Sequence, residues 1–233
     1  MLRNKKITAV VLAGGRGKRM ESKISKQFLE LGGNPILYYA LNTFENSVVD
    51  EIILVAAEGE EEYCKKKIVE QYHLKKVTGI VTGGKERYHS VYNGLCAVKQ
   101  TDIVMIHDGA RPFITEDVIE KAAREVIKCQ ACVVGVKVKD TIKVSQEGMI
   151  VDTPDRRNLW QVQTPQCFEY EGIRKAYEKA LEGQTDNITD DAMVWEMYSK
   201  IPVKLVEGSY FNIKITTKED MIFGEAILKW KNT

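Results

Sequence analysis

Residues 7–20 read ITAVVLAGGRGKRM, an apolar run rich in β-branched side chains that ends in a turn with three glycines. A short apolar run bounded by glycine is typical of a buried strand. Runs of the same kind follow at residues 51–57, 77–82, 102–107 and 132–138. Near-continuous apolar strands that alternate with helices predict a mostly parallel sheet covered on both faces. With right-handed crossovers, this predicts a doubly wound α/β fold.

The segments between and after these strands have apolar residues at helical spacing or a residue that can cap a helix. Thr115 is a candidate N-cap, because its hydroxyl can accept a backbone N–H of the first turn. Helices are expected at residues 35–44, 60–72, 87–99, 115–128 and 169–181, from about 190 and from 218. Further strands are expected at residues 203–206 and 211–215. A length of 233 residues suits a single domain over residues 1–233.

Charge and composition exclude several classes of protein. Lysine and arginine number 34 and aspartate and glutamate 33, which gives a formal net charge of +1. A dedicated nucleic-acid binder usually has a strong basic excess, so we expect no nucleic-acid partner. No apolar run approaches the roughly 18 residues of a membrane span, so we expect no membrane partner. The five cysteines, Cys129 and Cys132 among them, come without a secretion signal, which predicts a cytoplasmic protein with reduced thiols.

Residues 139–160 break the alternation of strands and helices. Two short strand-like pieces, at 141–145 and 149–152, are joined by Gln-Glu-Gly at 146–148, which is a hairpin signal. Such an excursion can pair with another subunit or can be a plain surface hairpin. The residues themselves leave both readings open.

Parallel sheets of this kind bind ligands beyond the carboxyl ends of their strands. The residues that follow the first strand, from Ala13 to Met20, are glycine-rich and carry three cations. Successive N–H groups of such a loop form a concavity that binds phosphate. The loop is not a dinucleotide fingerprint, because Met20 replaces the third glycine, and it is not a Walker A loop, because Arg19 follows Gly17-Lys18. A triphosphate suits it better than a neutral ligand, and the alternative is a tight turn with solvated charges.

Other strand ends carry candidate binding groups. Lys26 follows the glycine loop closely enough to reach the same phosphates. Asp108, beside Gly109, is a plausible Mg²⁺ ligand or ribose contact, and Arg111 can bind phosphate with two hydrogen bonds. Lys214 lies among apolar neighbours, and its default reading is a solvated strand lysine.

The turn at residues 83–90 has backbone N–H groups at a helix start that could bind a base or phosphate. No nucleophile elbow of the form GxSxG occurs, so covalent catalysis is not indicated. A glycine loop, several cations and a candidate metal carboxylate suit phosphoryl or nucleotidyl transfer instead.

Taken together, these motifs resemble the 2-C-methyl-D-erythritol 4-phosphate cytidylyltransferase family over essentially the whole chain. The matching segments are residues 15–20, 26–28, 83–91, 107–112, 138–143, 159–166, 189–192 and 212–214. The resemblance implies a Rossmann-like nucleotidyltransferase fold. It also implies transfer of a cytidylyl group from CTP to methylerythritol 4-phosphate with Mg²⁺, giving CDP-methylerythritol and pyrophosphate.

The resemblance implies a role for each matching residue. Arg19 and Lys26 match two cations that stabilise the transition state, and Arg156 and Lys214 match residues that position the alcohol phosphate. Asp108 remains the candidate metal ligand. The positions that match the nucleotide site are Ala13, Gly14, Gly15, Gly84, Ser90, Asp108 and Gly109, with Gly17 in the same glycine loop. The positions that match the polyol phosphate pocket are Arg111, Thr141, Thr164 and Thr189.

In the resembled family, the arm at about 139–160 reaches across a homodimer, so Arg111, Thr141 and Arg156 would serve the neighbour's site. The stretches LAGG at 12–15 and FNIKITT at 211–217 also resemble ribitol 5-phosphate cytidylyltransferases of teichoic acid synthesis. That acceptor is one alternative, and a non-catalytic CTP-sensing module is another. A nicotinamide-dependent dehydrogenase is disfavoured by the missing third glycine.

Overall fold

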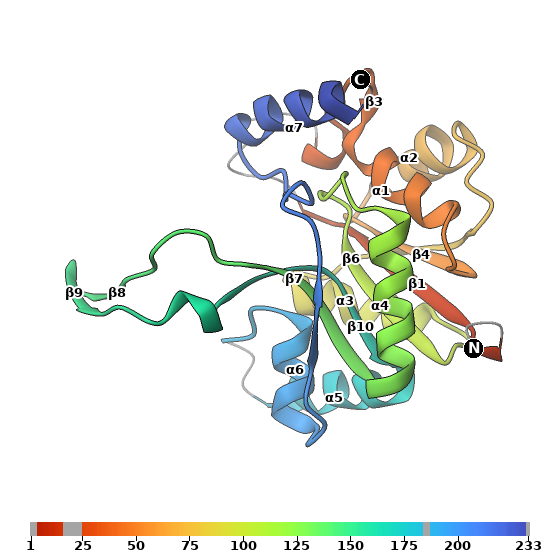
Figure 1. Cartoon of the computed structure of the whole chain (residues 1–233). Helices are drawn as coiled ribbons and strands as arrows, with labels where there is room; N and C mark the ends of the chain where they lie inside the picture. The colour runs from red at the N-terminus through yellow and green to blue at the C-terminus, as the bar shows by residue number, and fades with distance from the viewer. Residues whose placement is uncertain (1–3, 16–24, 184–186, 232–233) are drawn as a thin grey trace.

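A computed structural model describes residues 4–15, 25–183 and 187–231 of the chain. Within these residues, seven strands form one sheet in the order β11-β7-β10-β6-β1-β4-β5 (Figure 1). The strands are β1 (Ile7–Ala13), β4 (Glu51–Ala56), β5 (Val77–Thr82), β6 (Ile103–Asp108), β7 (Ala131–Lys137), β10 (Trp160–Glu169) and β11 (Lys204–Glu207). β10 runs antiparallel to β6 and β7, and the other neighbours are parallel. The predicted mostly parallel, doubly wound sheet is confirmed.

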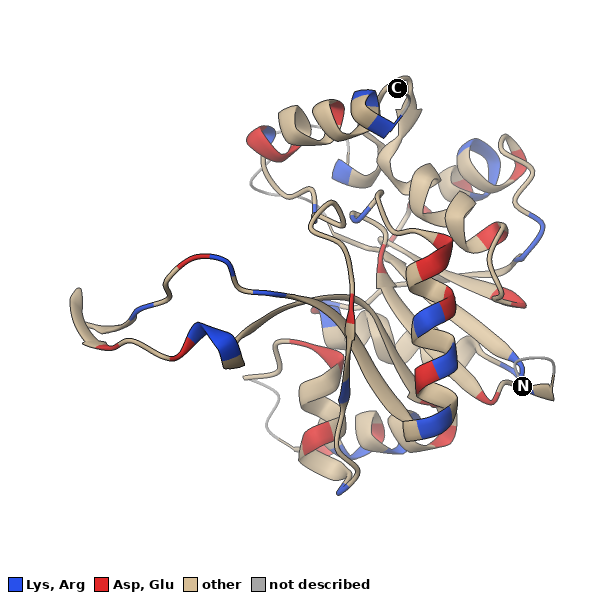
Figure 2. Cartoon of the chain, viewed as in Figure 1, with Lys and Arg blue, Asp and Glu red and all other residues tan. Residues whose placement is uncertain are grey.

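Helices cover both faces of the sheet. They are α1 (Ile36–Glu45), α2 (Glu61–Tyr63) with the π-helical turn Cys64–Glu70, α3 (Arg87–Ala97), α4 (Glu116–Cys129), α5 (Tyr170–Glu182) and α6 (Asp191–Tyr198). The last helix, α7 (Lys218–Lys231), packs instead in a separate cluster with Leu31 and Ile215. The hydroxyl of Thr115 accepts the N–H of Val118, so the predicted cap of α4 is confirmed. Acidic and basic residues alternate along the outward side of α4 in Figure 2, while its apolar residues face the sheet.

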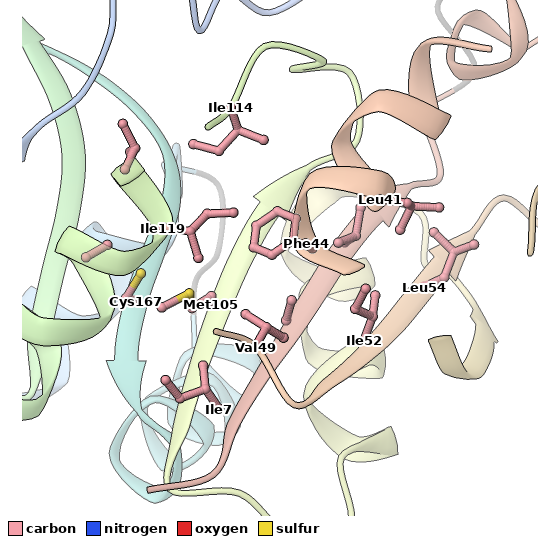
Figure 3. Close-up of a cluster of buried hydrophobic side chains, with 14 of the residues drawn as sticks. Ile7, Leu41, Phe44, Val49, Ile52, Leu54, Met105, Ile114, Ile119 and Cys167 are labelled. Atoms are coloured by element: carbon pink, nitrogen blue, oxygen red, sulfur yellow. The ribbon is translucent and has the colours of Figure 1, made fainter. Parts of the chain in front are cut away.

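The core follows from the alternation of side chains along each strand. Val11 and Leu54 point to the face covered by α1 and α4, where they belong to one cluster with Phe44. Figure 3 shows Leu54 and Phe44 in this cluster. Val10 and Val55, the chain neighbours of Val11 and Leu54, point to the opposite face, which α3, α5 and α6 cover. Both faces of the central strands are therefore buried, as their continuous apolar runs predict.

β10 lies between β6 and β7, although the sequence alone indicates no strand there. Its residues read WQVQTPQCFE, and polar side chains interrupt the apolar pattern that marks the other strands. Its pairing with β7 shifts register between Val162 and Gln166, around Pro165. Only the tertiary structure shows that Gln163, Thr164 and Gln166 are buried.

The strand predicted at residues 211–215 is wrong. This segment has no strand pairing, and its backbone is held by isolated bonds such as Ile215 N–H to the carbonyl of Ala110, 2.8 Å. The alternation of apolar residues that predicted a strand has another cause. Asn212 and Ile215 are buried because the segment runs past Thr164, in the middle of β10, and Ala110, just beyond the end of β6.

The predicted hairpin forms from β8 (Val144–Gln146) and β9 (Met149–Asp152). Glu147 and Gly148 both have positive φ, 49° and 80°, as a two-residue hairpin turn requires. The hairpin projects away from the sheet and helices in Figure 1, and every residue of both strands is exposed. Within the described ranges, no helix combines the length and apolar character needed to cross a membrane.

Candidate functional site

A cavity of about 710 Å³ opens at the carboxyl ends of the strands, where a doubly wound fold is expected to bind its ligand. It is lined by Leu12, Ala13, Gly14, Gly15, Lys26, Gln27, Ala57, Glu58, Gly83, Gly84, Lys85, Glu86, Arg87, Ser90, Asp108, Ala110 and Lys214. These residues come from the ends of β1, β4, β5 and β6 and from the segment before α7. Five of the predicted strand-end residues, Ala13, Gly14, Gly15, Gly84 and Asp108, therefore meet in one place.

Glycines form one wall of the cavity, and at Gly83 and Gly84 a side chain has no room. The hydroxyl of Ser90 accepts the N–H of Gly84 at 3.0 Å. A β-carbon added at Gly83 would lie 2.9 Å from this oxygen, and one at Gly84 would lie 2.3 Å from the β-carbon of His89. A β-carbon at Gly14 would lie 3.7 Å from the same hydroxyl. The wall thus presents backbone to a ligand, which suits phosphate or a base.

Lys26 lies beside this wall, in a single 3-10 turn over residues 26–28. A β-carbon at Gly15 would lie 3.5 Å from its Cε atom. The next side chain, Gln27, is buried and donates a hydrogen bond to the carbonyl of Ala13 at the end of β1. The turn that carries Lys26 is therefore hydrogen-bonded to the end of β1, directly before Gly14 and Gly15. The predicted residues Gly17 and Arg19 lie outside the described residues.

Asp108 is surrounded by cations from three parts of the chain. Among the described side chains, Lys214 Nζ lies 2.8 Å and Arg111 Nε 3.9 Å from its Oδ2, and Arg87 Nε lies 3.3 Å from its Oδ1. Burial alone would raise the pKa of the Asp108 carboxyl, but these cations hold it well below its usual range. Asp108 is thus a fixed negative charge at the cavity wall.

Lys214 is not the solvated strand lysine of the default reading, because Asp108 pairs with it at the cavity. The buried side chain of Asn212 holds its segment in place. The Asn212 amide donates to the carbonyl of Thr164 at 2.9 Å and to the Gln163 side chain at 3.2 Å. No pattern in the sequence predicts this role for Asn212, apart from its position two residues before Lys214.

Arg87 joins Asp108 to the start of α6. Its two terminal nitrogens each lie 2.8 Å from a carboxylate oxygen of Asp191, which is fully buried. The Tyr177 hydroxyl donates to the same carboxylate at 2.6 Å. Burial opposes the charge on Arg87, but the carboxylates of Asp191 and Asp108 raise its pKa well above the ordinary value. No local sequence pattern predicts a role for Arg87 or Asp191, since their pairing joins residues 104 positions apart.

His107 supports the turn behind Asp108. Its Nδ1 lies 3.0 Å from the Thr164 hydroxyl, and its Nε2 lies 3.3 Å from the carbonyl of Arg111. The Thr164 hydroxyl also accepts the N–H of Asp108 at 3.1 Å. Complete burial lowers the pKa of His107 to about 4. Thr164 therefore has its hydroxyl engaged behind the turn and does not line the cavity.

The free energy of unfolding is expected to rise by about 3 kcal/mol as pH increases from 4 to 6.5, because of His107. In that window the unfolded chain binds a proton at this imidazole, with an ordinary pKa of 6.5, while the folded chain does not. Lower pH thus favours unfolding. Urea denaturation at several pH values measures the slope. His107→Gln should flatten the dependence of the free energy of unfolding on pH. His73→Gln, at an exposed site, is the control and should leave that slope unchanged. An equal slope in both variants would show that His107 does not cause the pH dependence.

The remaining predicted residues do not line the cavity. Gly109 packs tightly, since a β-carbon there would lie 2.6 Å from Cδ1 of Leu37. Arg111 donates to the carbonyl of Asn212 at 2.8 Å in its own chain. Thr189 is exposed just before α6. Two more, Thr141 and Arg156, are exposed on the projecting arm, where Arg156 donates to the carbonyl of Lys139 at 2.8 Å.

The sequence is similar to a known family of enzymes over nearly its whole length. A family model described as 2-C-methyl-D-erythritol 4-phosphate cytidylyltransferase matches residues 7–230. Relatives of that description from Lachnoclostridium phytofermentans and Clostridium botulinum strain 657 are 51% and 52% identical, over 96% of this chain and 97% and 98% of theirs.

Solved structures give the same result. A 4-diphosphocytidyl-2C-methyl-D-erythritol synthase from Anaerococcus prevotii is 37% identical, with a TM-score of 0.86 over 98% of both chains. A 2-C-methyl-D-erythritol 4-phosphate cytidylyltransferase from Thermus thermophilus is 26% identical, with a TM-score of 0.79 over 96% of this chain and 99% of that one.

Proposed function

The chain belongs to the 2-C-methyl-D-erythritol 4-phosphate cytidylyltransferase family, and we propose that it carries out the family reaction in the cavity beside Asp108. The reaction transfers the cytidylyl group of CTP to methylerythritol 4-phosphate and releases pyrophosphate, in the non-mevalonate route to isoprenoids. The relatives favour this acceptor over ribitol 5-phosphate, and an enzyme over a CTP sensor. One observation carries the choice of cavity: Lys26, Asp108 and Lys214, far apart in sequence, line it beside the glycine wall.

We assign the nucleotide to the glycine wall. The backbone at Gly14, Gly15 and Gly84 can approach phosphates closely, and Ser90 fixes the wall. The substrate phosphate oxygen attacks the α-phosphorus of CTP in line, and pyrophosphate leaves. Lys26, with Arg19 of the glycine loop, then stabilises the charge that develops at the α-phosphate. Most of the catalysis comes from positioning and charge, as in other phosphoryl transfers.

Lys214 is assigned to the phosphate of the acceptor. Its ammonium group lies at the cavity, paired with Asp108 at 2.8 Å, and its side chain is 38% exposed. An incoming phosphate would therefore find a cation whose position is already fixed, which lowers the entropy cost of binding.

Mg²⁺ is the proposed cofactor, and Asp108 is the proposed protein ligand. Mg²⁺ at nucleotide sites usually takes one or two carboxylates together with substrate phosphates. Across the described ranges there is no cluster of three acidic, histidine or cysteine side chains, so a cage made by protein alone does not form there. The ionised Asp108 on the cavity wall fits the first arrangement. When bound, Mg²⁺ would neutralise charge on the triphosphate.

We propose a homodimer in which the arm of one copy completes the cavity of the other. Thr141 and Arg156 lie on the arm, which points away from the sheet and helices of its own chain (Figure 1). The arm also exposes Met149, Ile150 and Val151, at 72%, 64% and 55%. Apolar side chains this exposed on a projecting hairpin favour burial against a second copy.

Mixing two inactive variants tests the shared cavity. Arg156→Ala should lose most activity because it removes a cation from the acceptor phosphate. Subunits of this variant exchanged with Lys26→Ala subunits should recover about a quarter of the wild-type activity, since half the dimers then hold one intact site of two. Pyrophosphate release measures recovery, and native mass spectrometry verifies heterodimers. No recovery in verified heterodimers would contradict a cavity shared between two subunits. Arg157→Ala is the control, because it removes the neighbouring arginine, which pairs with Asp155, and this variant should stay active.

We also propose that the chain is a single domain and that it works in the cytoplasm. The core clusters on either side of the sheet share the same strands, which supports a single domain over residues 1–233. All five cysteines lie in the described part of the chain and are free thiols, which is typical of the cytoplasm.

A further inference from the structure

The turn that carries Lys26 is fastened on both sides by one carboxylate, Glu60. The Ser25 hydroxyl donates to one oxygen of Glu60, and the Gln27 amide donates to the other at 3.1 Å. Ser25 and Gln27 are the immediate neighbours of Lys26 in the sequence. We propose that Glu60 is a positioning residue that holds Lys26 at the cavity. The inference rests on the role proposed above for Lys26.

The Gln27 side chain links this carboxylate to the glycine wall. Its amide nitrogen donates to Glu60 and also to the carbonyl of Ala13, where β1 ends. An amide has two N–H groups, so it can make both bonds at once. Gln27 is only 1% exposed, and water therefore has little access to replace either bond. Glu60, Gln27 and Ala13 form a continuous connection from the start of α2 to the wall beside Lys26.

The turn needs this support because it is short. Residues 26–28 make a single 3-10 turn, closed by the N–H of Phe28 to the carbonyl of Ser25 at 2.9 Å. Such turns have poor hydrogen-bond geometry and little stability of their own. Glu60 has backbone bonds on both sides, since its N–H donates to the carbonyl of Ala57 at 2.9 Å and its carbonyl accepts the N–H of Cys64 at 2.9 Å. Cys64 is itself fully buried, so the start of α2 is packed against the core. The packed start of α2 thus holds the short turn that carries Lys26 at the cavity.

Removing the carboxylate should move Lys26 without removing it. We expect Glu60→Ala to lower kcat about 10- to 100-fold, because a displacement of about 1 Å at a catalytic group can cost that much. The KM for CTP should change less than about threefold, since the glycine wall is untouched. Glu61→Ala is the matched control: it deletes the next carboxylate in the chain, which bonds Thr82, and should leave kcat unchanged.

Glu60→Gln should restore turnover to within about fivefold of the wild type. The new amide oxygen can accept from Gln27, and its nitrogen can donate to the hydroxyl of Ser25, so both connections can form again. This variant also keeps the test valid if Glu60→Ala folds poorly. A purely structural role predicts a lower urea midpoint with unchanged kcat per folded enzyme, and that result would overturn the proposal.

A double-mutant cycle with Lys26 separates the two proposals. If Glu60 acts through Lys26, Glu60→Ala should cause no further loss of kcat in a Lys26→Ala background. Losses that multiply would show that Glu60 acts by another route and would overturn the inference alone. Normal turnover in Lys26→Ala would instead overturn both the role of Lys26 and the role of Glu60.

Discussion

Lys26→Ala is expected to lower kcat by a factor of about 100 to 1,000, the loss typical of removing one group that stabilises transition-state charge. The affinity for CTP should change much less. The Lys26 side chain lies against Gly15 at the cavity, and its charge matters most when negative charge builds at the α-phosphate. Pyrophosphate release gives kcat, and titration calorimetry gives the Kd of CTP.

The control for this variant must remove a charge without touching the cavity. Lys66→Ala meets this requirement, because Lys66 is an exposed lysine that pairs with Glu62 on the surface. Its kcat should stay within about twofold of the wild type, since surface pairs of this kind contribute little. If Lys26→Ala keeps normal turnover, or loses turnover and CTP binding in equal proportion, Lys26 does not stabilise the transition state.

Asp191→Ala is expected to destabilise the fold by about 3 kcal/mol, the lower part of the range for breaking a buried ion pair. The substitution leaves Arg87 without its two-bond partner and leaves the buried hydroxyl of Tyr177 without an acceptor. The lower part of the range applies because the Arg87 side chain is 30% exposed, so water can partly solvate its charge when Asp191 is removed. Urea denaturation followed by circular dichroism measures the loss.

A second substitution separates the lost charge pair from lost packing. In the double variant Asp191→Ala/Arg87→Met, no unpaired charge remains, so part of the lost stability should return. Asp191→Asn should lie between the wild type and the alanine variant, because an amide can still accept from Arg87. A loss below about 1 kcal/mol for Asp191→Ala would mean that water already solvates the pair.

Local patterns in the sequence are enough to predict the parallel core of this protein and the edge of the sheet where the cavity lies. Continuous apolar runs such as Ile7–Ala13 can be satisfied only by burial on both faces, and glycines after them mark the strand ends. These are local signals, so they can be read from neighbouring residues. The resemblance to the cytidylyltransferase family added the functional roles, and the family itself is confirmed by the relatives.

The pairing of the polar groups around Asp108 depends on the folded chain and could not be predicted from local sequence. Residues far apart in the chain meet there, as when Arg87 bonds Asp191 over 104 positions and Asn212 bonds the carbonyl of Thr164 over 48. β10 could not be predicted from local sequence either, because its residues are largely polar. It is a strand because it pairs with β6 on one side and β7 on the other. Such residues carry no periodic pattern. A buried polar group must form a hydrogen bond, and its partner can come from any part of the chain that the fold places beside it. Such partners therefore depend on the packing of the whole chain.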